Sequence, residues 1–315
     1  MILDAIRRIG VLAVTALTAT VIVFLLLSVL PGDPARAQLG VDATDAQVAA
    51  LRSELGLDRP LLTRYGHWLL GLLRGDLGES YLTRQSVTPE VVGALEVTLI
   101  LVLAGMVIAV LIAIPLGTLS AVRQGRPDGV VLAALSQLGI SIPNFVMALL
   151  LVLVFAVGLR WLPSGGWVAP IQGPWQLLER LILPALSLGI VRGAILARYT
   201  RSAVLDVQRE DFMRTAQAKG MTGAAALWRH GLRNALVPVL TVTGVEFSGL
   251  LIGAVVIESV FVIPGLGALL LRAVSNRDMG EVQAIVIVVV IMVLLINALV
   301  DLAHTLVDPR MRSAS

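Results

Sequence analysis

Few residues of this sequence are of a type and spacing that support chemistry. The chain has no cysteine, which excludes disulfides, thiolate metal sites and a cysteine nucleophile. Its three histidines, His67, His230 and His304, show no metal-ligand spacing. No His-Glu-x-x-His motif, Ser–His pairing, aspartate dyad or G-x-x-x-x-G-K-[ST] phosphate loop is present. We therefore expect a protein that is not an enzyme and that binds no metal, cofactor or ATP itself.

The most informative ionisable residues lie inside long apolar segments, where an unpaired charge is costly to bury. Arg192 falls in one such segment, Glu246 and Glu258 in another, and Asp301 and His304 in a third. Arg192 and Glu246 could form an ion pair across a helix bundle. We expect Glu258 and Asp301 to lie near opposite ends of their helices, where water reaches them. Arg192, Glu246 and Glu258 are the candidate polar residues of a pathway.

The composition places these apolar segments in a membrane. The chain has 315 residues, of which 57% are hydrophobic and 14% charged, and its mean hydropathy is +0.91. Soluble domains have about 25% charged residues. The net charge of +3 and the pI near 9.9 do not indicate nucleic-acid binding, because the arginines are not gathered on one face with stacking aromatics.

Six apolar runs are long enough to cross a bilayer, and helices are the expected spanning elements because lipid offers no water to open backbone groups. The first run is too long for the core of a signal peptide and indicates a retained helix. The fourth is the weakest, since proline, glycine and Arg192 interrupt it. Two glycine pairs, Gly189/Gly193 and Gly249/Gly253, permit close helix packing. The runs are Ile9–Leu30, Val97–Leu119, Val130–Leu159, Leu181–Tyr199, Leu236–Ile263 and Ala284–Leu306.

The distribution of positive charge predicts the orientation of these helices. With the N-terminus in the cytoplasm, the inner segments hold thirteen Arg and Lys residues, and the two short outer loops with their flanks hold only Arg160, Arg180, Arg272 and Arg277. Both ends are therefore expected in the cytoplasm. The resulting layout is a cytoplasmic N-terminus and first helix (1–30), an extracytoplasmic segment (31–92), a five-helix core with a cytoplasmic loop at 200–235 (93–309), and a cytoplasmic tail (310–315).

The outer segment is longer than a simple connection needs. Within it, Ala43–Leu55 is expected to form a short helix, and the amphipathic stretch Leu61–Leu73 is expected to lie along the outer surface. The segment is either a docking platform for a partner, a lid or a surface cap.

The cytoplasmic loop contains a second candidate site, in the stretch EDFMRTAQAKGMTGAAALWRHGLRNALVP. Glu210 and Asp211 suit a first helical turn, Lys219 a last turn, and Gly220 a stop after it. Such a helix would insert into a groove of another protein or form a solvated or membrane-surface hairpin. Its compact, small-residue face comprises Phe212, Met213, Ala216 and Gln217.

The same residues resemble a known motif. Arg214-Thr215-Ala216, three residues and then Gly220 are similar to the cytoplasmic Glu-Ala-Ala loop of bacterial ABC importer permeases. Arg-Thr replaces Glu-Ala, and Pro238 falls five residues later than usual, as in the peptide and nickel branch of that family. The resemblance implies that this loop docks on an ATPase. The residues it assigns to the ATPase-coupling loop are Glu210, Phe212, Met213, Arg214, Thr215, Ala216, Ala218, Lys219 and Gly220.

The resemblance extends over nearly the whole chain and is to the B-type subunit of dipeptide and oligopeptide permeases. Glu246 departs from it, because the family more often has glutamine there. The motifs that carry it are Leu57-Asp58-Arg59-Pro60, Tyr65, Trp68, Gly75-Asp76-Leu77-Gly78, Ser80, Ile142-Pro143, Leu162-Pro163, Gly165-Gly166, Glu258-Ser259-Val260-Phe261, Pro264-Gly265-Leu266-Gly267, Asn276-Arg277-Asp278, Val300-Asp301-Leu302 and Asp308-Pro309-Arg310.

The resemblance implies a type I ABC importer permease fold in the bacterial cytoplasmic membrane. It implies a heterodimer with a second permease, two cytoplasmic ATPases that use ATP, and an extracytoplasmic binding protein that delivers a di- or oligopeptide. Nickel or another small solute is the alternative within this class. An ion-coupled secondary carrier, from another class, would need inverted repeats, and the sequence shows no convincing repeat.

Overall fold

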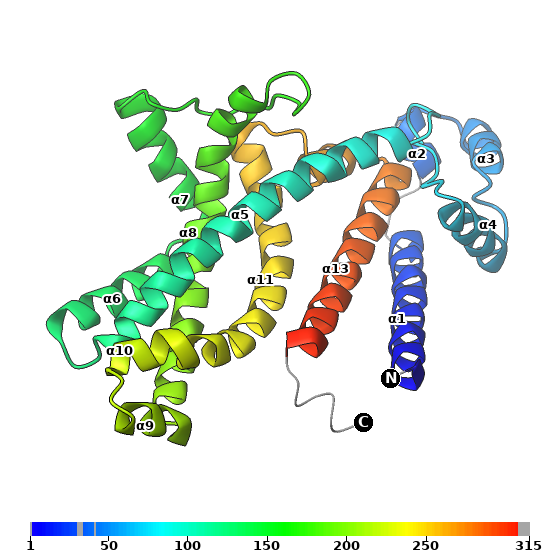
Figure 1. Ribbon diagram of the computed structural model, residues 1–315. Coiled ribbons are helices and arrows are strands. Elements are labelled where there is room, and N and C mark those ends of the chain that lie inside the picture. The colour runs from blue at the N-terminus through cyan, green and yellow to red at the C-terminus, as the bar shows by residue number, and fades with distance from the viewer. Residues whose placement is uncertain (1, 30–33, 41, 308–315) are drawn as a thin grey trace. The chain divides into compact units, whose positions relative to one another are not determined.

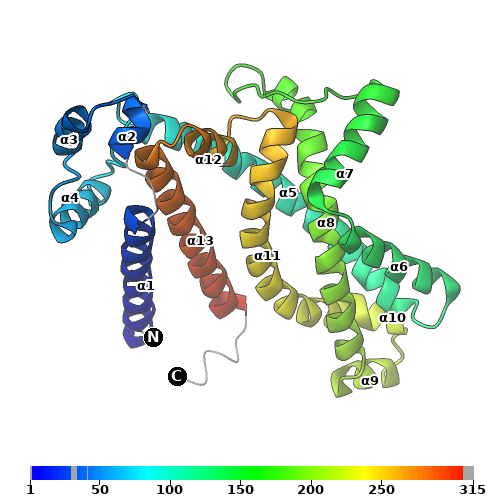
Figure 2. The same ribbon diagram turned by 180° about the vertical axis from the view of Figure 1, so that it is seen from behind.

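The computed structural model describes residues 2–29, 34–40 and 42–307. Within them the regular structure is helical, apart from one isolated bridge between Glu79 and Ser86 (Figures 1 and 2). This confirms the expected all-α class. The expected tail 310–315 and the motif Asp308-Pro309-Arg310 lie outside the described residues.

Five of the described helical stretches are long and apolar enough to cross a membrane. A sixth crossing is a bent pair, made of α6 (Pro127–Ser141) and of α7 (Asn144–Leu151) with its continuation, the π-helix η1 (Val152–Gly158). With that pair counted as one broken span, the total is the six expected. The five spanning helices are α1 (Ile2–Val29), α5 (Thr88–Val122), α8 (Pro174–Gln208), α11 (Leu232–Phe261) and α13 (Met279–Val307).

The bent pair shows that the expected run Val130–Leu159 is not one straight helix. Its two halves meet at 104°. Pro143 has no N–H to continue the helix, and its ring disfavours helical backbone at the preceding residue. Ile142 is accordingly extended, with φ −92° and ψ 121°, and it ends α6.

Helix α8 contains the fourth apolar run, which is the weakest candidate span because proline, glycine and Arg192 interrupt it. The helix nevertheless continues without a break through Pro184. It is also the most enclosed of the five spans, with 61% of its apolar window buried inside the chain. Gly189 and Gly193 pack against α5: a Cβ on Gly189 would lie 2.5 Å from Cγ2 of Ile108. The low hydropathy of α8 therefore reflects contact with protein rather than with lipid, and this pair of glycines serves packing, as predicted.

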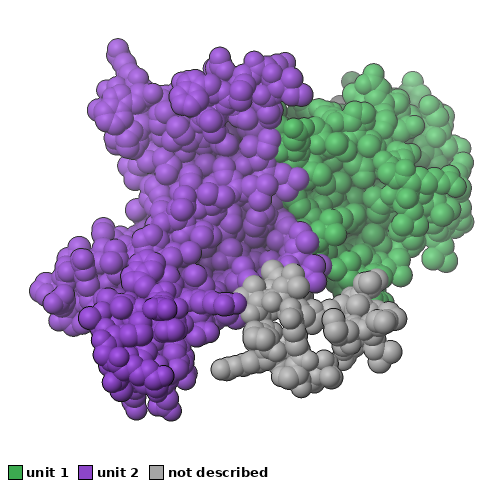
Figure 3. All heavy atoms as spheres, in the orientation of Figure 1, with its two compact units in different colours: residues 1–97, 264–295 green, residues 98–263, 296–315 purple. Residues whose placement is uncertain are grey.

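The chain forms two compact units, coloured separately in Figure 3. Unit 1 contains Met1–Val97 and Pro264–Leu295, and unit 2 contains Thr98–Ile263 and Ile296–Ser315. The chain passes between the units within α5, between α11 and α12, and within α13. The shorter helices of unit 1 are α2 (Pro34–Leu39), α3 (Asp45–Glu54), α4 (Leu61–Leu73) and α12 (Leu266–Ser275).

Unit 1 contains the two helices that were expected in the outer segment. Helix α3 begins at a capping box in which Thr44 and Gln47 satisfy each other's backbone N–H groups. Helix α4 has the predicted bounds and packs on α1 through rings. The centroid of Phe24 lies 5.4 Å from that of Tyr65 and 5.8 Å from that of Trp68. Part of the apolar side of α4 is thus covered by α1 of the same chain.

Candidate functional site

The segment that joins α8 to α11 in unit 2 is itself helical (Figure 1). Glu210 occupies the N-cap position of its first helix, and Asp211 lies in the first turn. Carboxylates are favourable there because a helix N-terminus carries partial positive charge. The elements of the segment are α9 (Asp211–Ala218), α10 (Gly223–Ala226) and the π-helix η2 (Leu227–Gly231).

Helix α9 ends where the sequence predicts. Lys219 is its C-cap, and Gly220 follows with φ +91°. The N–H of Gly220 donates to the carbonyl of Gln217 at 2.9 Å, and the N–H of Met221 donates to the carbonyl of Ala216 at 3.2 Å. These two bonds form a Schellman motif, which requires the left-handed backbone that glycine adopts most easily.

The compact face expected on α9 is divided between two environments. Met213 is 1% exposed and Ala216 is 8% exposed, whereas Phe212 and Gln217 face outward. The prediction of one face presented to another protein was wrong, because helices of this chain supply the apolar cover for half of it. The exposed positions of α9 are Asp211, Phe212, Arg214, Thr215, Gln217 and Ala218, and Lys219 and Gly220 after it are exposed too.

The buried half of α9 belongs to an apolar cluster that joins it to three membrane helices, α5, α8 and α11. A Cβ on Gly231 of η2 would lie 3.2 Å from Sδ of Met213, so the turn of η2 fits closely over this side chain. Close-packed interiors transmit displacement rather than absorb it. The buried half of α9 is therefore closely packed against these helices. The buried members are Ala121, Ala203, Val204, Met213, Ala216, Ala226, Leu227, Ala235 and Val239.

The predicted ion pair between Arg192 on α8 and Glu246 on α11 is confirmed. Nη1 of Arg192 donates to Oε2 of Glu246 at 2.9 Å, and Nη2 donates to the carbonyl of Gly249 at 2.7 Å. The two side chains are 20% and 13% exposed. A Cβ on Gly249 would lie 2.6 Å from Nη1, so a larger residue there would displace the guanidinium from this position. The pair therefore joins α8 and α11 in the apolar part of unit 2.

Glu258 lies near the end of α11, as expected, but water does not reach it. Its exposed fraction is 0%. Oγ1 of Thr98 on α5 donates a hydrogen bond to Oε1 of Glu258 at 2.6 Å. The prediction of a water-exposed carboxylate was wrong, because α5 covers this end of α11. Helix position alone does not show which neighbour lies over it. The other expectations in this region, Asp301 and His304, concern side chains whose surroundings are not described.

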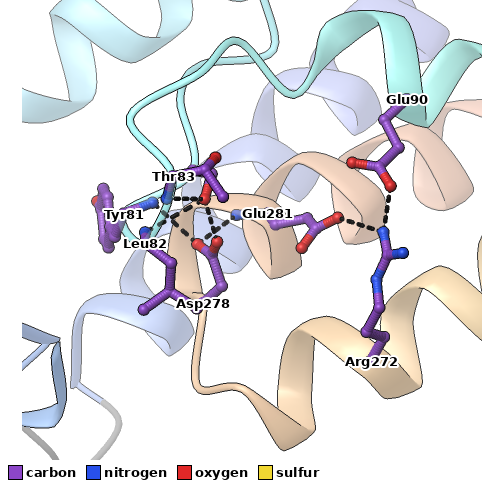
Figure 4. Close-up of polar contacts among 8 residues, drawn as sticks. Tyr81, Leu82, Thr83, Glu90, Arg272, Asp278 and Glu281 are labelled. Carbon is purple, nitrogen blue, oxygen red and sulfur yellow. Dashed lines mark hydrogen bonds and ion pairs between the residues drawn. The ribbon is translucent and has the colours of Figure 1, made fainter.

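A further polar cluster, in unit 1, was not predicted (Figure 4). Its centre is Asp278, which is 2% exposed. Oδ2 of Asp278 accepts a hydrogen bond from the hydroxyl of Ser80, and Oδ1 accepts from the N–H of Tyr81 at 3.0 Å and from the N–H of Glu281 at 3.2 Å. The carboxylate thus caps α13 and holds the loop around Ser80. The cap on α13 could have been predicted from the sequence, because Asp278 directly precedes a long apolar helix. The contact with the loop around Ser80 could not.

Arg272 extends this cluster to the first turn of α5. Its Nη2 pairs with Glu90 and lies 3.5 Å from Oε1 of Glu281. The hydrogen bond that Arg272 donates to the carboxylate of Glu90 raises the pKa of the Arg272 guanidinium, and burial raises the pKa of the Tyr81 hydroxyl. Tyr81 therefore remains neutral and Arg272 remains charged at neutral pH. The cluster fixes the ends of α5, α12 and α13 to one loop of unit 1.

Two family models match this chain. One, described as a binding-protein-dependent transport system inner membrane component, matches residues 113–313. The other, described as the N-terminal part of such a membrane component, matches residues 1–104. Together they cover most of both units.

Similar proteins match along almost their whole length. A protein of Sinorhizobium fredii named "probable peptide ABC transporter permease protein" is 42% identical over 308 residues, which cover 97% of each chain. The glutathione transport system permease protein of Pectobacterium atrosepticum is 41% identical over 308 residues, 98% of each chain. The crystal structure of an amino acid ABC transporter is similar in fold, with a TM-score of 0.53 and 20% identity over 69% of this chain and 94% of that one.

Proposed function

Because this chain belongs to the family of binding-protein-dependent transport system inner membrane components, we propose that it is the permease subunit of an ATP-driven ABC importer for di- or oligopeptides. Relatives named for peptide and glutathione transport match it end to end, and glutathione is itself a small peptide. The chain is a multi-pass membrane protein. We place it in the bacterial cytoplasmic membrane with both ends inside, on the arginine asymmetry.

The proposed assembly pairs this chain with a second, homologous permease, so that each forms half of the translocation pathway. Two cytoplasmic ATPases bind and hydrolyse ATP, and an extracytoplasmic binding protein delivers the peptide. This chain supplies the membrane path and no catalytic residue. The outer segment, with α3 and α4, is the proposed docking surface for the binding protein.

The observation that carries the mechanism is the division of α9 into an exposed and a buried half. The exposed half, which includes Phe212 and Arg214, docks into a cleft of an ATPase. The buried half, centred on Met213, packs against α8 and α11. Closure of the ATPases displaces α9, and the apolar cluster passes that displacement to the two helices. The Arg192–Glu246 pair keeps α8 and α11 together as they move.

Reconstitution tests this function. The four membrane and ATPase subunits in vesicles, with loaded binding protein outside and ATP inside, are expected to accumulate a labelled dipeptide or tripeptide. Uptake should need hydrolysable ATP and should persist when ionophores collapse the proton and sodium gradients. Uptake of labelled nickel that excess peptide does not reduce would overturn the peptide substrate. Uptake that follows an ion gradient without ATP would overturn the importer itself.

A further inference from the structure

Helix α4 carries a strip of leucines that is largely open in the described part of the chain. Leu62 is 85% exposed and Leu73 is 76% exposed. Leu69, which is partly exposed, lies between them. The spacing of seven and four residues places these three leucines along one side of an α-helix. Leu70, which is 55% exposed, adjoins the strip. An open apolar strip of this kind marks a surface that something outside the chain covers.

The contacts between α4 and α1 set the level of the strip in the membrane. Both helices belong to unit 1, and both views show α4 beside the C-terminal half of α1 (Figures 1 and 2). The hydroxyl of Tyr65 lies 2.9 Å from Oγ1 of Thr20, and the rings of Tyr65 and Trp68 pack on Phe24. The apolar span of α1 is Gly10–Ser28, so Phe24 lies about 6 Å inside its end at 1.5 Å per residue. Helix α4 is therefore held within the apolar layer, near its edge.

The surroundings at this level indicate what covers the strip. Next to Phe24, α1 exposes Leu25 and Leu26, which are 45% and 64% exposed, as a spanning helix does toward lipid. The leucine strip of α4 is thus apolar at the level where α1 is apolar too. His67, on a different side of α4, is exposed and polar. A helix with one apolar and one polar side, held at the edge of the apolar layer, has the properties of an interfacial helix.

We propose that α4 is immersed in the outer leaflet of the membrane, with Leu62, Leu69 and Leu73 among the acyl chains and His67 at the level of the headgroups. Lipid covers the leucine strip, and α3 and the polar side of α4 stay open to the binding protein. Tyr65 and Trp68 fix α4 to α1, so the two helices form one anchor for the outer segment. This inference rests on the membrane span of α1 and holds for a peptide, nickel or any other substrate. Only the choice of leaflet uses the proposed orientation.

The test places single cysteines in this chain, which has none of its own, and assembles it with cysteine-free partner subunits in phosphatidylcholine vesicles. The variants are Leu62→Cys and Leu73→Cys on the strip, His67→Cys as the matched control on the same helix, and Leu26→Cys on α1 as the lipid reference. Each carries an environment-sensitive fluorophore. Phospholipids with a nitroxide on the acyl chain should quench the dyes at Leu62 and Leu73 as they quench the dye at Leu26, and about threefold more strongly than the dye at His67. Iodide on both sides of the membrane should give the reverse order.

Loaded binding protein is then added, and it should leave the quenching at Leu62 and Leu73 unchanged. The proposal is overturned if iodide quenches these two dyes as strongly as the dye at His67, because the strip would then lie in water. It is also overturned if binding protein reduces their quenching, because the strip would then be part of a protein interface. The measurement needs neither ATP nor peptide, so its failure is distinguishable from a failure of the proposed transport function.

Discussion

Arg192 and Glu246, on two different helices, form an ion pair whose nearest atoms are 2.9 Å apart in the apolar part of unit 2. Both side chains are largely removed from water. Removing one partner of a buried pair leaves an uncompensated charge, whereas removing both charges together can be nearly neutral. The energetic importance of this pair is therefore seen only when the single and double substitutions are compared.

We expect Arg192→Met to destabilise the protein by about 3–5 kcal/mol, because Glu246 is left charged without its partner. Arg192→Met/Glu246→Gln should recover most of that loss, since glutamine is neutral and needs no charged partner. Thermal unfolding of the purified complex in detergent measures both, with Arg126→Gln as the exposed control. If the double substitution is as unstable as the sum of its single changes, the pair is not what holds the two helices.

The two neighbouring residues Phe212 and Met213 should behave in opposite ways. Met213→Ala removes a side chain that is 1% exposed, at the centre of the apolar cluster, and should cost about 2–5 kcal/mol of stability. Phe212→Ala removes a side chain that is 38% exposed and should leave the unfolding temperature nearly unchanged. It should instead weaken binding of the ATPase subunits, measured as the subunit ratio after gel filtration. Loss of stability from Phe212→Ala, with normal ATPase binding, would contradict the division of α9.

The end of α9 at Gly220 should matter for coupling ATP hydrolysis to transport. Gly220→Val places a branched side chain at φ +91°, where L-residues are disfavoured by about 1–2 kcal/mol, and should misdirect the chain after Lys219. ATPase activity stimulated by loaded binding protein and peptide uptake are expected to fall together. Gly223→Val is the matched control, because a Cβ there would lie 3.6 Å from the side chain of Gln217, an ordinary contact. If Gly220→Val and Gly223→Val lower ATPase activity and uptake equally, the left-handed backbone at Gly220 is not the cause of the loss.

Features whose cause is local could be predicted from the sequence. Gly220 ends α9 because glycine readily adopts the left-handed backbone that follows a helix end. The break at Ile142-Pro143 also has a local cause in the geometry of proline, although the run Val130–Leu159 was expected as one helix. The Arg192–Glu246 pair was also predictable. Each charge lies in an apolar run, where a partner is nearly obligatory.

Features that depend on how the helices pack against one another could not be predicted from the sequence. The apolar face of α9 is evident from its spacing, but only the packing of α8, η2 and α11 shows that Met213 is already covered. Glu258 was expected in water because it is near a helix end, and Thr98 of another helix lies over it. The contact between Ser80 and Asp278 joins residues 198 positions apart, and no local pattern indicates such a pair.

The Ser80–Asp278 contact makes a prediction for the outer segment. Asp278→Ala removes the acceptor of three hydrogen bonds, one each from Ser80, Tyr81 and Glu281, and should cost about 2–4 kcal/mol because these buried donors lose their partner. The loop around Ser80 should then become sensitive to external protease in spheroplasts. Ser80→Ala, which removes only one donor, should cost about 1 kcal/mol. If the two variants resist protease like the parent, the loop is held by its apolar contacts instead.

The topology can be tested with single cysteines, since the natural chain has none. Suitable sites must be exposed, which excludes Ser80, because it is 6% exposed and bonded to Asp278. Thr83 and Ser164 are exposed on the expected outer side, and Ser202 and Gln217 on the expected inner side.

In intact cells an impermeant maleimide is expected to label Thr83→Cys and Ser164→Cys but not Ser202→Cys or Gln217→Cys. After the membrane is permeabilised, all four should react, which shows that the unlabelled pair was shielded by the membrane and not by the fold. The reverse pattern would place α9 outside, where no ATPase could reach it. The orientation and the docking role of α9 would then both be wrong, because each depends on the same distribution of positive charge.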